Sequence, residues 1–354
     1  MQLIELDDYN IYIGEVWQPL SELLRMRAYS QHLVLVDENT GAHCLPHLQR
    51  QLSSIDWKVI KIQAGELHKN IETCQFIWQQ MMDLGVNRNA VLLNLGGGVI
   101  GDMGGFCAGT FKRGIDFIQV PTTLLSQVDA SIGGKLGIDF MQVKNSIGLF
   151  CNPQGVFIVP EFLKTLPARE VRSGFAEIIK HALIHDVEQW AHLQRIEALA
   201  AVDWTEYLPI SLAVKKHIVQ EDPFEKGIRK ALNFGHTIGH AIEGWALETD
   251  KPLLHGEAIA IGMICEAWLS HKILNLPLEQ VHEIGRFIKR IYDGYDLPKT
   301  AYPTFIQLMK KDKKNELAEI NFSLIQPIGN AVINQSAEAN LILESLDFYT
   351  THYA

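Results

Sequence analysis

Three potential metal ligands occur in distinctive local settings although they lie far apart in the chain. They are Glu177 in Gly174-Phe-Ala-Glu-Ile-Ile-Lys180, His236 in Asn233-Phe-Gly-His-Thr-Ile-Gly-His240, and His255 in Leu254-His-Gly-Glu257. Two neutral imidazoles and one carboxylate suit zinc or cobalt, and three protein ligands leave one coordination position open for a substrate. These residues therefore predict an open, catalytic metal site.

A glycine-rich segment upstream could hold a phosphate. The run Gly96-Gly-Gly-Val-Ile-Gly-Asp102 directly follows an apolar stretch, and a helix is expected over 99–109. The amides of Gly97 and Gly98 could then face a pyrophosphate at the N-terminus of that helix. Glycine-rich turns between a strand and a helix also occur for tight packing alone, so both interpretations stay open at this point. With an open metal site, a nucleotide turn indicates oxidation of an alcohol or loss of a phosphate.

Further polar residues accompany the candidate ligands. His236 and His240 are four residues apart and share a helical face, as do Glu177 and Lys180 at a spacing of three. The alternative for the histidine pair is a surface couple or a capped couple in the core, and Glu257 could serve only to stabilise a helix N-terminus. In an acidic protein, cations beside glycine turns indicate a pocket for a phosphorylated or carboxylated small molecule. The basic residues concerned are Arg113, Lys135, Lys144, Lys180, Lys215, Arg229 and the cluster 310–314, most of whose lysines are expected to be solvated. Gly133-Gly-Lys135 lacks the Walker spacing, which disfavours ATP.

Composition limits the class of protein. The chain has 354 residues, 47% hydrophobic and 20% charged, which is enough interior for two domains. Its 31 basic and 41 acidic residues give a net charge of −10, which disfavours binding to nucleic acid or to an anionic membrane. The sequence has no apolar run long enough to span a bilayer and no signal-peptide pattern at its start, so a cytoplasmic location is expected. The five scattered cysteines are expected to be reduced thiols.

Hydrophobic periodicity predicts the elements that must position these residues. Short apolar runs at 32–37, 57–62, 90–95 and 115–120 predict strands separated by helices, which indicates a mostly parallel sheet covered on both faces. Beyond about Leu166, helical patterns predominate, at 172–185, 210–220, 231–246, 256–274 and 278–292, with a short hairpin at 320–326 and 331–334. We therefore expect an α/β, Rossmann-like nucleotide-binding domain over 1–165 and an all-α domain that binds metal and substrate over 166–354. The proline-bracketed segment 153–167 would connect them.

Long motifs in register carry a family resemblance over nearly the whole chain. The segments are Asn94–Asp102, Arg113–Asp129, Gly133–Lys135 with Lys144-Asn145, Leu166–Glu170, Gly174–Lys180, Gly227–Glu243 and Leu254–Glu257. Together they resemble 3-dehydroquinate synthase, a member of the sugar phosphate cyclase superfamily. Leu136 and Asp139 depart from the family pattern, without removing any proposed ligand.

The resemblance implies an NAD-dependent lyase that uses Zn²⁺ or Co²⁺. Such an enzyme converts the phosphorylated sugar acid 3-deoxy-D-arabino-heptulosonate 7-phosphate into 3-dehydroquinate and phosphate, a step of the shikimate pathway and of aromatic amino acid biosynthesis. The substrate alcohol is oxidised transiently, phosphate leaves by β-elimination, the hydride returns, and an intramolecular aldol reaction closes the ring.

The resemblance also implies a role for individual residues. Glu177, His236 and His255 would hold the metal, and His240 would take part in proton handling. Arg113 resembles a residue that this family lends across a homodimer interface. The residues implied for NAD are Asp37, at the adenosine ribose, and Glu66, Lys69, Gly97, Gly98, Asp102, Thr122, Thr123, Lys135, Lys144 and Thr165. Those implied for the substrate are Asp129, Lys135, Asn145, Lys180, Lys215, Arg229, Asn233 and Lys313.

Three alternatives remain at this stage. Another sugar phosphate cyclase would share the metal and NAD, but its substrate would have no carboxylate and would need no pocket for one. In this chain, four basic residues are available for such a pocket: Lys135, Lys215, Arg229 and Lys313. An NAD-linked polyol dehydrogenase would accumulate NADH. A catalytically silent binding protein would fail to bind both NAD and metal.

Overall fold

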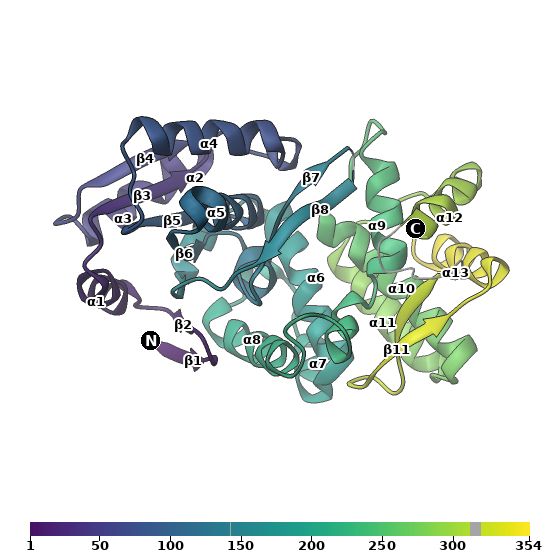
Figure 1. Ribbon diagram of the computed structural model, residues 1–354. Helices are drawn as coiled ribbons and strands as arrows, with labels where there is room; N and C mark the ends of the chain where they lie inside the picture. Colours follow the sequence, from purple (N-terminus) through teal and green to yellow (C-terminus); the bar gives the residue numbers. More distant parts are fainter. Residues whose placement is uncertain (142, 312–319) are drawn as a thin grey trace. The chain divides into compact units, whose positions relative to one another are not determined.

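The computed structural model describes residues 1–141, 143–311 and 320–354 (Figure 1). The chain forms two compact units. The first comprises Met1–Pro167 and Trp204–Lys216, and the second comprises Ala168–Asp203 and His217–Ala354. Residues 204–216 therefore belong by their contacts to the first unit. A single boundary near residue 166, as expected from the sequence, would assign them to the second unit. Among the described residues, no helix combines the length and the apolar character that crossing a membrane requires.

A seven-stranded sheet forms the centre of the first unit, in the order β1-β2-β9-β6-β5-β3-β4. The strands are β1 (Gln2–Glu5), β2 (Asn10–Ile13), β3 (Gln31–Val36), β4 (Trp57–Lys61), β5 (Ala90–Gly96), β6 (Asp116–Pro121) and β9 (Val156–Ile158). All neighbouring pairs are parallel except β1 with β2. The four predicted strands are confirmed. The sequence did not reveal β1, β2 and β9, because strands of three or four residues give too short a pattern.

Both faces of this sheet are buried, as its apolar strands require. Leu33 and Leu35 pack on one face in a cluster with residues of α4 (Ile71–Asp83) and α5 (Gly98–Thr110). Val34 and Val36 point to the other face and pack with residues of α1 (Trp17–Arg27) and α3 (Leu45–Gln51). The remaining elements of this unit include α2 (Glu38–His43), residues 204–216 of α8 (Trp204–Glu221), and the antiparallel hairpin of β7 (Lys135–Phe140) and β8 (Val143–Phe150).

Several glycines of α5 let that helix lie close to its neighbours. A Cβ atom on Gly104 would stand 2.1 Å from Oδ1 of Asn94 in β5, and one on Gly105 would stand 2.5 Å from Leu136 in β7. A larger residue at Gly104 would require the Asn94 side chain or the helix to move, and one at Gly105 would require the Leu136 side chain to move. Tight packing therefore accounts for these two glycines, whereas Gly97 and Gly98 precede them at the start of the helix.

The second unit is built around one buried helix, α10 (His255–Leu274). It contacts α6 (Ala168–His185), α9 (His236–Ala246), α11 (Leu278–Ile291) and α13 (Ala339–His352). The unit also contains α7 (Val187–Leu193), α12 (Tyr302–Lys311), and β10 (Asn321–Ile325) paired with β11 (Ala331–Ser336). The predicted hairpin and the α/β plus helical fold class are thus confirmed.

One predicted helix begins too early. Residues 231–246 were expected to be a single helix, but Ile228–Asn233 form a 3₁₀ turn and α9 begins only at His236. Gly235 interrupts the pattern because its φ is +79°, a left-handed conformation that glycine adopts without a steric penalty. The interruption places His236 in the first turn of α9 rather than in the middle of a longer helix.

Candidate metal and nucleotide sites

The three predicted metal ligands converge in the second unit. Oε1 of Glu177 lies 3.5 Å from Nε2 of His236 and 3.7 Å from Nε2 of His255. Donor atoms held about 2.1 Å from a tetrahedral ion are about 3.4 Å apart. The two separations from Glu177 therefore suit a zinc or cobalt ion.

Hydrogen bonds fix which nitrogen of each imidazole faces Glu177. Nδ1 of His236 lies 3.1 Å from the carbonyl oxygen of Phe234, and Nδ1 of His255 lies 3.3 Å from Oε2 of Glu243. When each Nδ1–H donates to these oxygens, the lone pair of Nε2 points toward Glu177. Such outer partners orient the imidazole ligands of metals and raise their basicity.

Sequence reasoning gave no role to Glu243. Its spacing offered a signal, because His236, His240 and Glu243 follow one another at intervals of four and three and so share one face of α9. The rings of His240 and His255 are 5.6 Å apart, and the ligand atoms of His236, His240 and His255 all lie within 4.8 Å of one another. His240 therefore lies beside the candidate ligands, close enough to be a further candidate for the same metal ion.

The electrostatics of this site favour a cation. Burial acts to lower the pKa of His255, but the carboxylates of Glu243 and Glu177 outweigh it and raise the pKa to about 9. Lys180, almost fully buried, pairs with Oε2 of Glu177 and leaves Oε1 facing the two histidines. Carboxylates that hold a proton on a neighbouring imidazole can equally stabilise a metal ion in its place.

Glycine contacts bring the three ligand-bearing helices together. A Cβ atom on Gly256 of α10 would stand 1.8 Å from the carbonyl oxygen of Ser173 in α6. One on Gly262 of α10 would stand 2.0 Å from the carbonyl oxygen of Gly235, at the start of α9. Only glycine permits such backbone approach. Gly256 and Gly262 thus allow the close approach of α6, α9 and α10.

A second residue that sequence reasoning missed is Glu266 of α10. Its buried carboxylate accepts hydrogen bonds from the amides of Gly235 at 2.6 Å and Ile238 at 3.0 Å. These amides belong to the N-terminus of α9, where a negative charge is favourable. Glu266 thereby holds the turn that carries His236. The apolar residues around Glu266 in the sequence indicated a buried helix but gave no sign of this role.

Other predicted residues of the second unit lie in the segment before α9. Nη1 of the buried Arg229 donates to the carbonyl oxygen of Pro223 at 2.6 Å, and Nδ2 of Asn233 donates to Glu225 at 3.1 Å. Glu225 has a φ of +58°, a strained conformation for a non-glycine residue that often marks a functional loop. Lys313 lies outside the described residues.

In the first unit, predicted residues form two polar groups. Nζ of Lys69 lies 2.6 Å from Oδ2 of Asp102 and 2.7 Å from Oδ1 of Asn145. Nζ of Lys215, in α8, donates to the backbone oxygen of Asp129 at 2.9 Å and also pairs with its carboxylate. Burial raises the pKa of Asp102, although the ammonium of Lys69 opposes that shift.

Further predicted residues of this unit lie outside these two groups. Nζ of Lys144 lies 3.9 Å from Oε1 of Glu66. Lys135 is the first residue of β7, and Arg113 has a φ of +69° in the turn that follows α5. Thr165 donates to the carbonyl oxygen of Phe162 at 3.2 Å, at the end of the first unit.

Five of the nucleotide candidates follow strands beside a reversal in strand order. From β3 the chain forms β4 on one side and then returns to form β5 on the other side. Ligands of such sheets bind at the carboxyl ends of the strands where this reversal occurs. Asp37 follows β3 there, and Gly97 and Gly98 follow β5. Thr122 and Thr123 follow the next strand, β6.

Some of these residues also have a local structural role. Oδ1 of Asp37 accepts a hydrogen bond from the amide of Thr40 at 2.7 Å and so caps α2. The buried amide of Thr122 donates to the carbonyl oxygen of Gly96 at 3.0 Å. Gly97 caps α5 and lies against Thr123, whose Cγ2 would be 3.0 Å from a Cβ at this position. Two successive glycines thus leave the helix N-terminus without side chains that would cover its amides.

Comparison with known proteins agrees with this fold. A family model described as the N-terminal part of 3-dehydroquinate synthase matches residues 59–173, and one for its C-terminal part matches residues 174–315. A 3-dehydroquinate synthase of Parabacteroides distasonis is 43% identical over 336 residues, covering 93% of this chain and 94% of that protein.

Two solved structures share the fold. A 2-deoxy-scyllo-inosose synthase complexed with carbaglucose-6-phosphate, NAD⁺ and Co²⁺ superposes with a TM-score of 0.87 at 24% identity and covers 98% of each chain. A 2-epi-5-epi-valiolone synthase from Streptomyces hygroscopicus subsp. jinggangensis 5008, with NAD⁺ and Zn²⁺ bound, gives 0.86 at 25% identity and covers 99% of each chain. The fold is thus that of the sugar phosphate cyclases. Within this class, the chain belongs to the 3-dehydroquinate synthase family.

Proposed function

We propose that this protein is a phosphorus–oxygen lyase that converts 3-deoxy-D-arabino-heptulosonate 7-phosphate into 3-dehydroquinate and phosphate. The observation that carries the proposal is the convergence of Glu177, His236 and His255, three residues from three family motifs, at distances that suit one metal ion. Membership of the family supports the choice of substrate.

The donor set fits the metal, and the reversal in strand order fits a dinucleotide. Glu177, His236 and His255 would hold Zn²⁺ or Co²⁺, and Asp37, Gly97 and Gly98 would bind NAD with its pyrophosphate at the N-terminus of α5. When bound, the metal would supply Lewis acidity to the substrate hydroxyls and carbonyl, and NAD would accept a hydride and return it.

The side chains of the site would orient the metal ligands, move protons and bind the substrate. Lys180 fixes the orientation of Glu177 through their buried ion pair. His240 would accept or deliver a proton beside the ligands, because its ring lies 5.1 Å from that of His236. We assign binding of the polyol, carboxylate and phosphate to the charged and amide side chains that the family resemblance implies. These are Asp129, Lys135, Asn145, Lys215, Arg229 and Asn233.

The finer assignments follow from the family resemblance. For NAD they extend to Glu66, Lys69, Asp102, Thr122, Thr123, Lys135, Lys144 and Thr165. A homodimer to which each chain contributes Arg113 is part of the same proposal. Replacing Arg113 with Ala should lower turnover, and activity should return when this variant is mixed with an inactive His255→Ala variant, because a mixed dimer contains one intact site.

One experiment tests the main proposal against its alternatives. Purified protein loaded with zinc is incubated with the heptulosonate phosphate and NAD⁺, and phosphate release is followed together with absorbance of NADH. A lyase releases phosphate in many turnovers without net NADH, whereas a polyol dehydrogenase accumulates NADH. Absence of phosphate release from metal-replete protein would refute the synthase assignment.

A parallel incubation distinguishes another sugar phosphate cyclase. Glucose 6-phosphate and sedoheptulose 7-phosphate lack the carboxylate of the heptulosonate, so phosphate release from either would favour the alternative that the related fold supports. A His255→Ala variant provides the matched control, because it removes one imidazole without touching the candidate NAD residues. A protein that binds neither NAD nor zinc would instead have a silent binding role.

A further inference from the structure

Three residues on one face of α6 point toward the first turn of α10. Arg169, Ser173 and Glu177 are spaced at intervals of four residues, so they stand above one another along the helix. Arg169 and Ser173 bond to the residues around His255, and Glu177 lies 3.7 Å from Nε2 of His255 itself. The same helix face thus carries a candidate metal ligand and two contacts to the turn that holds another ligand.

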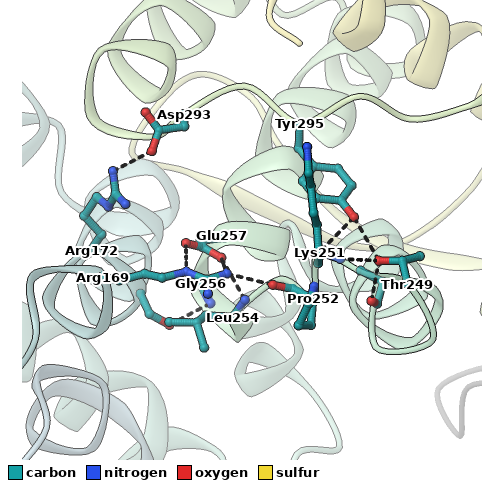
Figure 2. Close-up of polar contacts among 12 residues, drawn as sticks. Arg169, Arg172, Thr249, Lys251, Pro252, Leu254, Gly256, Glu257, Asp293 and Tyr295 are labelled. Carbon is teal, nitrogen blue, oxygen red and sulfur yellow. Dashed lines mark hydrogen bonds and ion pairs between the residues drawn. The ribbon is translucent and has the colours of Figure 1, made fainter.

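The contacts of Arg169 form a bidentate fork. Its Nε and Nη2 lie 2.7 Å from Oε1 and Oε2 of Glu257, and Nη2 also lies 2.7 Å from the carbonyl oxygen of Pro252 (Figure 2). Oε2 of Glu257 accepts a further hydrogen bond from the amide of Leu254 at 2.8 Å. Because Leu254 directly precedes His255, the fork holds the backbone on one side of that ligand.

Ser173 holds the backbone on the other side. Its Oγ accepts a hydrogen bond from the amide of Gly256 at 3.0 Å, and Gly256 directly follows His255. The contact is close, since a Cβ on Gly256 would stand 1.8 Å from the carbonyl oxygen of Ser173. Both neighbours of His255 in the chain are therefore tied to α6, the helix that carries Glu177.

We propose that the ion pair of Arg169 and Glu257 is a positioning device that sets the separation of Glu177 and His255 in the metal site. The inference rests on the metal site of the proposed function. A planar fork bonded at two points defines both a distance and an angle, which a lysine ammonium cannot do. The Arg169 side chain is 47% exposed, so the pair adds little to stability, and its geometry is the property that matters.

The chain offers a matched control in Arg172. It lies three residues further along α6 and lines the same cavity of about 390 Å³ as Arg169 and Glu257. Its ion pair goes to the exposed Asp293, at 2.9 Å, rather than to the first turn of α10 (Figure 2). Arg172→Lys therefore makes the same chemical change, beside the same cavity, without altering the contacts around His255.

The test measures metal binding rather than turnover. Zinc dissociation constants are determined by competition with a chromophoric chelator for the unaltered protein, Arg169→Lys, Glu257→Gln and Arg172→Lys, and visible absorption spectra are recorded after loading with Co²⁺. We expect zinc binding to weaken about tenfold in Arg169→Lys and Glu257→Gln, with a changed Co²⁺ spectrum, as for the loss of other groups that orient metal ligands. Arg172→Lys should match the unaltered protein in both measurements.

Two results separate failure of this inference from failure of the metal site. If His255→Ala binds zinc as tightly as the unaltered protein, the site itself is wrong, and the positioning role falls with it. If His255→Ala binds weakly but Arg169→Lys and Glu257→Gln retain both the affinity and the spectrum, only the positioning role is overturned. Glu257→Gln keeps the size of the side chain and an acceptor for the Leu254 amide, so it serves if Arg169→Lys does not fold.

Discussion

Nδ1 of His255 lies 3.3 Å from Oε2 of Glu243, a buried carboxylate on the neighbouring helix α9. This contact directs Nε2 of His255 toward Glu177 and places a negative charge behind the imidazole. Metal sites commonly pair a ligating histidine with a carboxylate in this way, because the pair fixes the tautomer and strengthens the ligand.

Glu243→Gln should weaken zinc binding by about tenfold or more, because an amide orients His255 without supplying charge. In the metal-free variant, the pKa of His255 should fall below about 9, since Glu243 is the larger of the two carboxylate contributions that raise it. Chelator competition and an NMR titration of the imidazole measure the two effects. Glu248→Gln, an exposed change beyond the end of α9, should alter neither quantity.

Gly262→Ala should disrupt the approach of α9 to α10. The new methyl group would stand 2.0 Å from the carbonyl oxygen of Gly235, and backbone cannot yield as a side chain would. We expect a loss of about 1–3 kcal/mol in the free energy of unfolding, with weaker zinc binding because His236 shifts. Gly244→Ala is the control, since the nearest atom to its Cβ lies at 3.8 Å and alanine favours the helix. Equal stability of the two variants in urea would contradict this account of the packing.

Asp37→Ser separates the local role of this residue from its proposed role with NAD. Serine also caps helix N-termini, so α2 should persist and the unfolding temperature should change little. Loss of a charged acceptor for a ribose hydroxyl should raise the Kd for NAD⁺ about tenfold, as measured by calorimetry. Asp186→Ser makes the same change at the cap of α7, where the aspartate accepts from Gln189, and should leave NAD⁺ binding unaltered. An unchanged Kd in Asp37→Ser would exclude Asp37 from the nucleotide site.

Asp222 should make the stability of the loop before Arg229 depend on pH. Its carboxylate accepts from the amides of Lys226 at 2.9 Å, Gly227 at 2.6 Å and Arg229 at 3.1 Å. Burial acts to raise the pKa of Asp222, but these amides outweigh it and lower the pKa below the ordinary 3.8. A lowered pKa means that the stabilisation is present above pH 3.8 and is lost as the pH falls through the lower folded value.

Asp222→Asn should therefore cost about 1 kcal/mol at pH 7, and the difference from the unaltered protein should shrink as the pH falls from 5 toward 3. Urea unfolding at several pH values measures this difference, with Asp250→Asn, an exposed change, as the control. A constant difference across that range would show that the carboxylate charge has no part in holding the loop.

The types of ligand and the elements that carry them could be predicted from the amino-acid pattern. Apolar runs such as 90–95 define buried strands because a strand with both faces covered has no polar side, and β5 is buried along its whole length. The motifs around Glu177, His236 and His255 indicated a set of metal ligands, because carboxylates and imidazoles can be recognised as ligands from their residue types. The role of the glycine motif at 96–98 could not be assigned to packing or to ligand binding, since both roles require a residue without a side chain.

Contacts between distant segments could be identified only in the folded chain. The roles of Glu243 and Glu266 depend on the packing of α9 against α10. The ion pair of Arg169 with Glu257 joins residues 88 positions apart. The reversal in strand order beside β3, which brings Asp37 and Gly97 to the same end of the sheet, depends likewise on strand pairing. Such relations are fixed by packing between distant segments, whereas periodicity and spacing report only on neighbours within one helix or strand. The local pattern shows which face of a helix or strand is buried, but it does not show which other element covers that face.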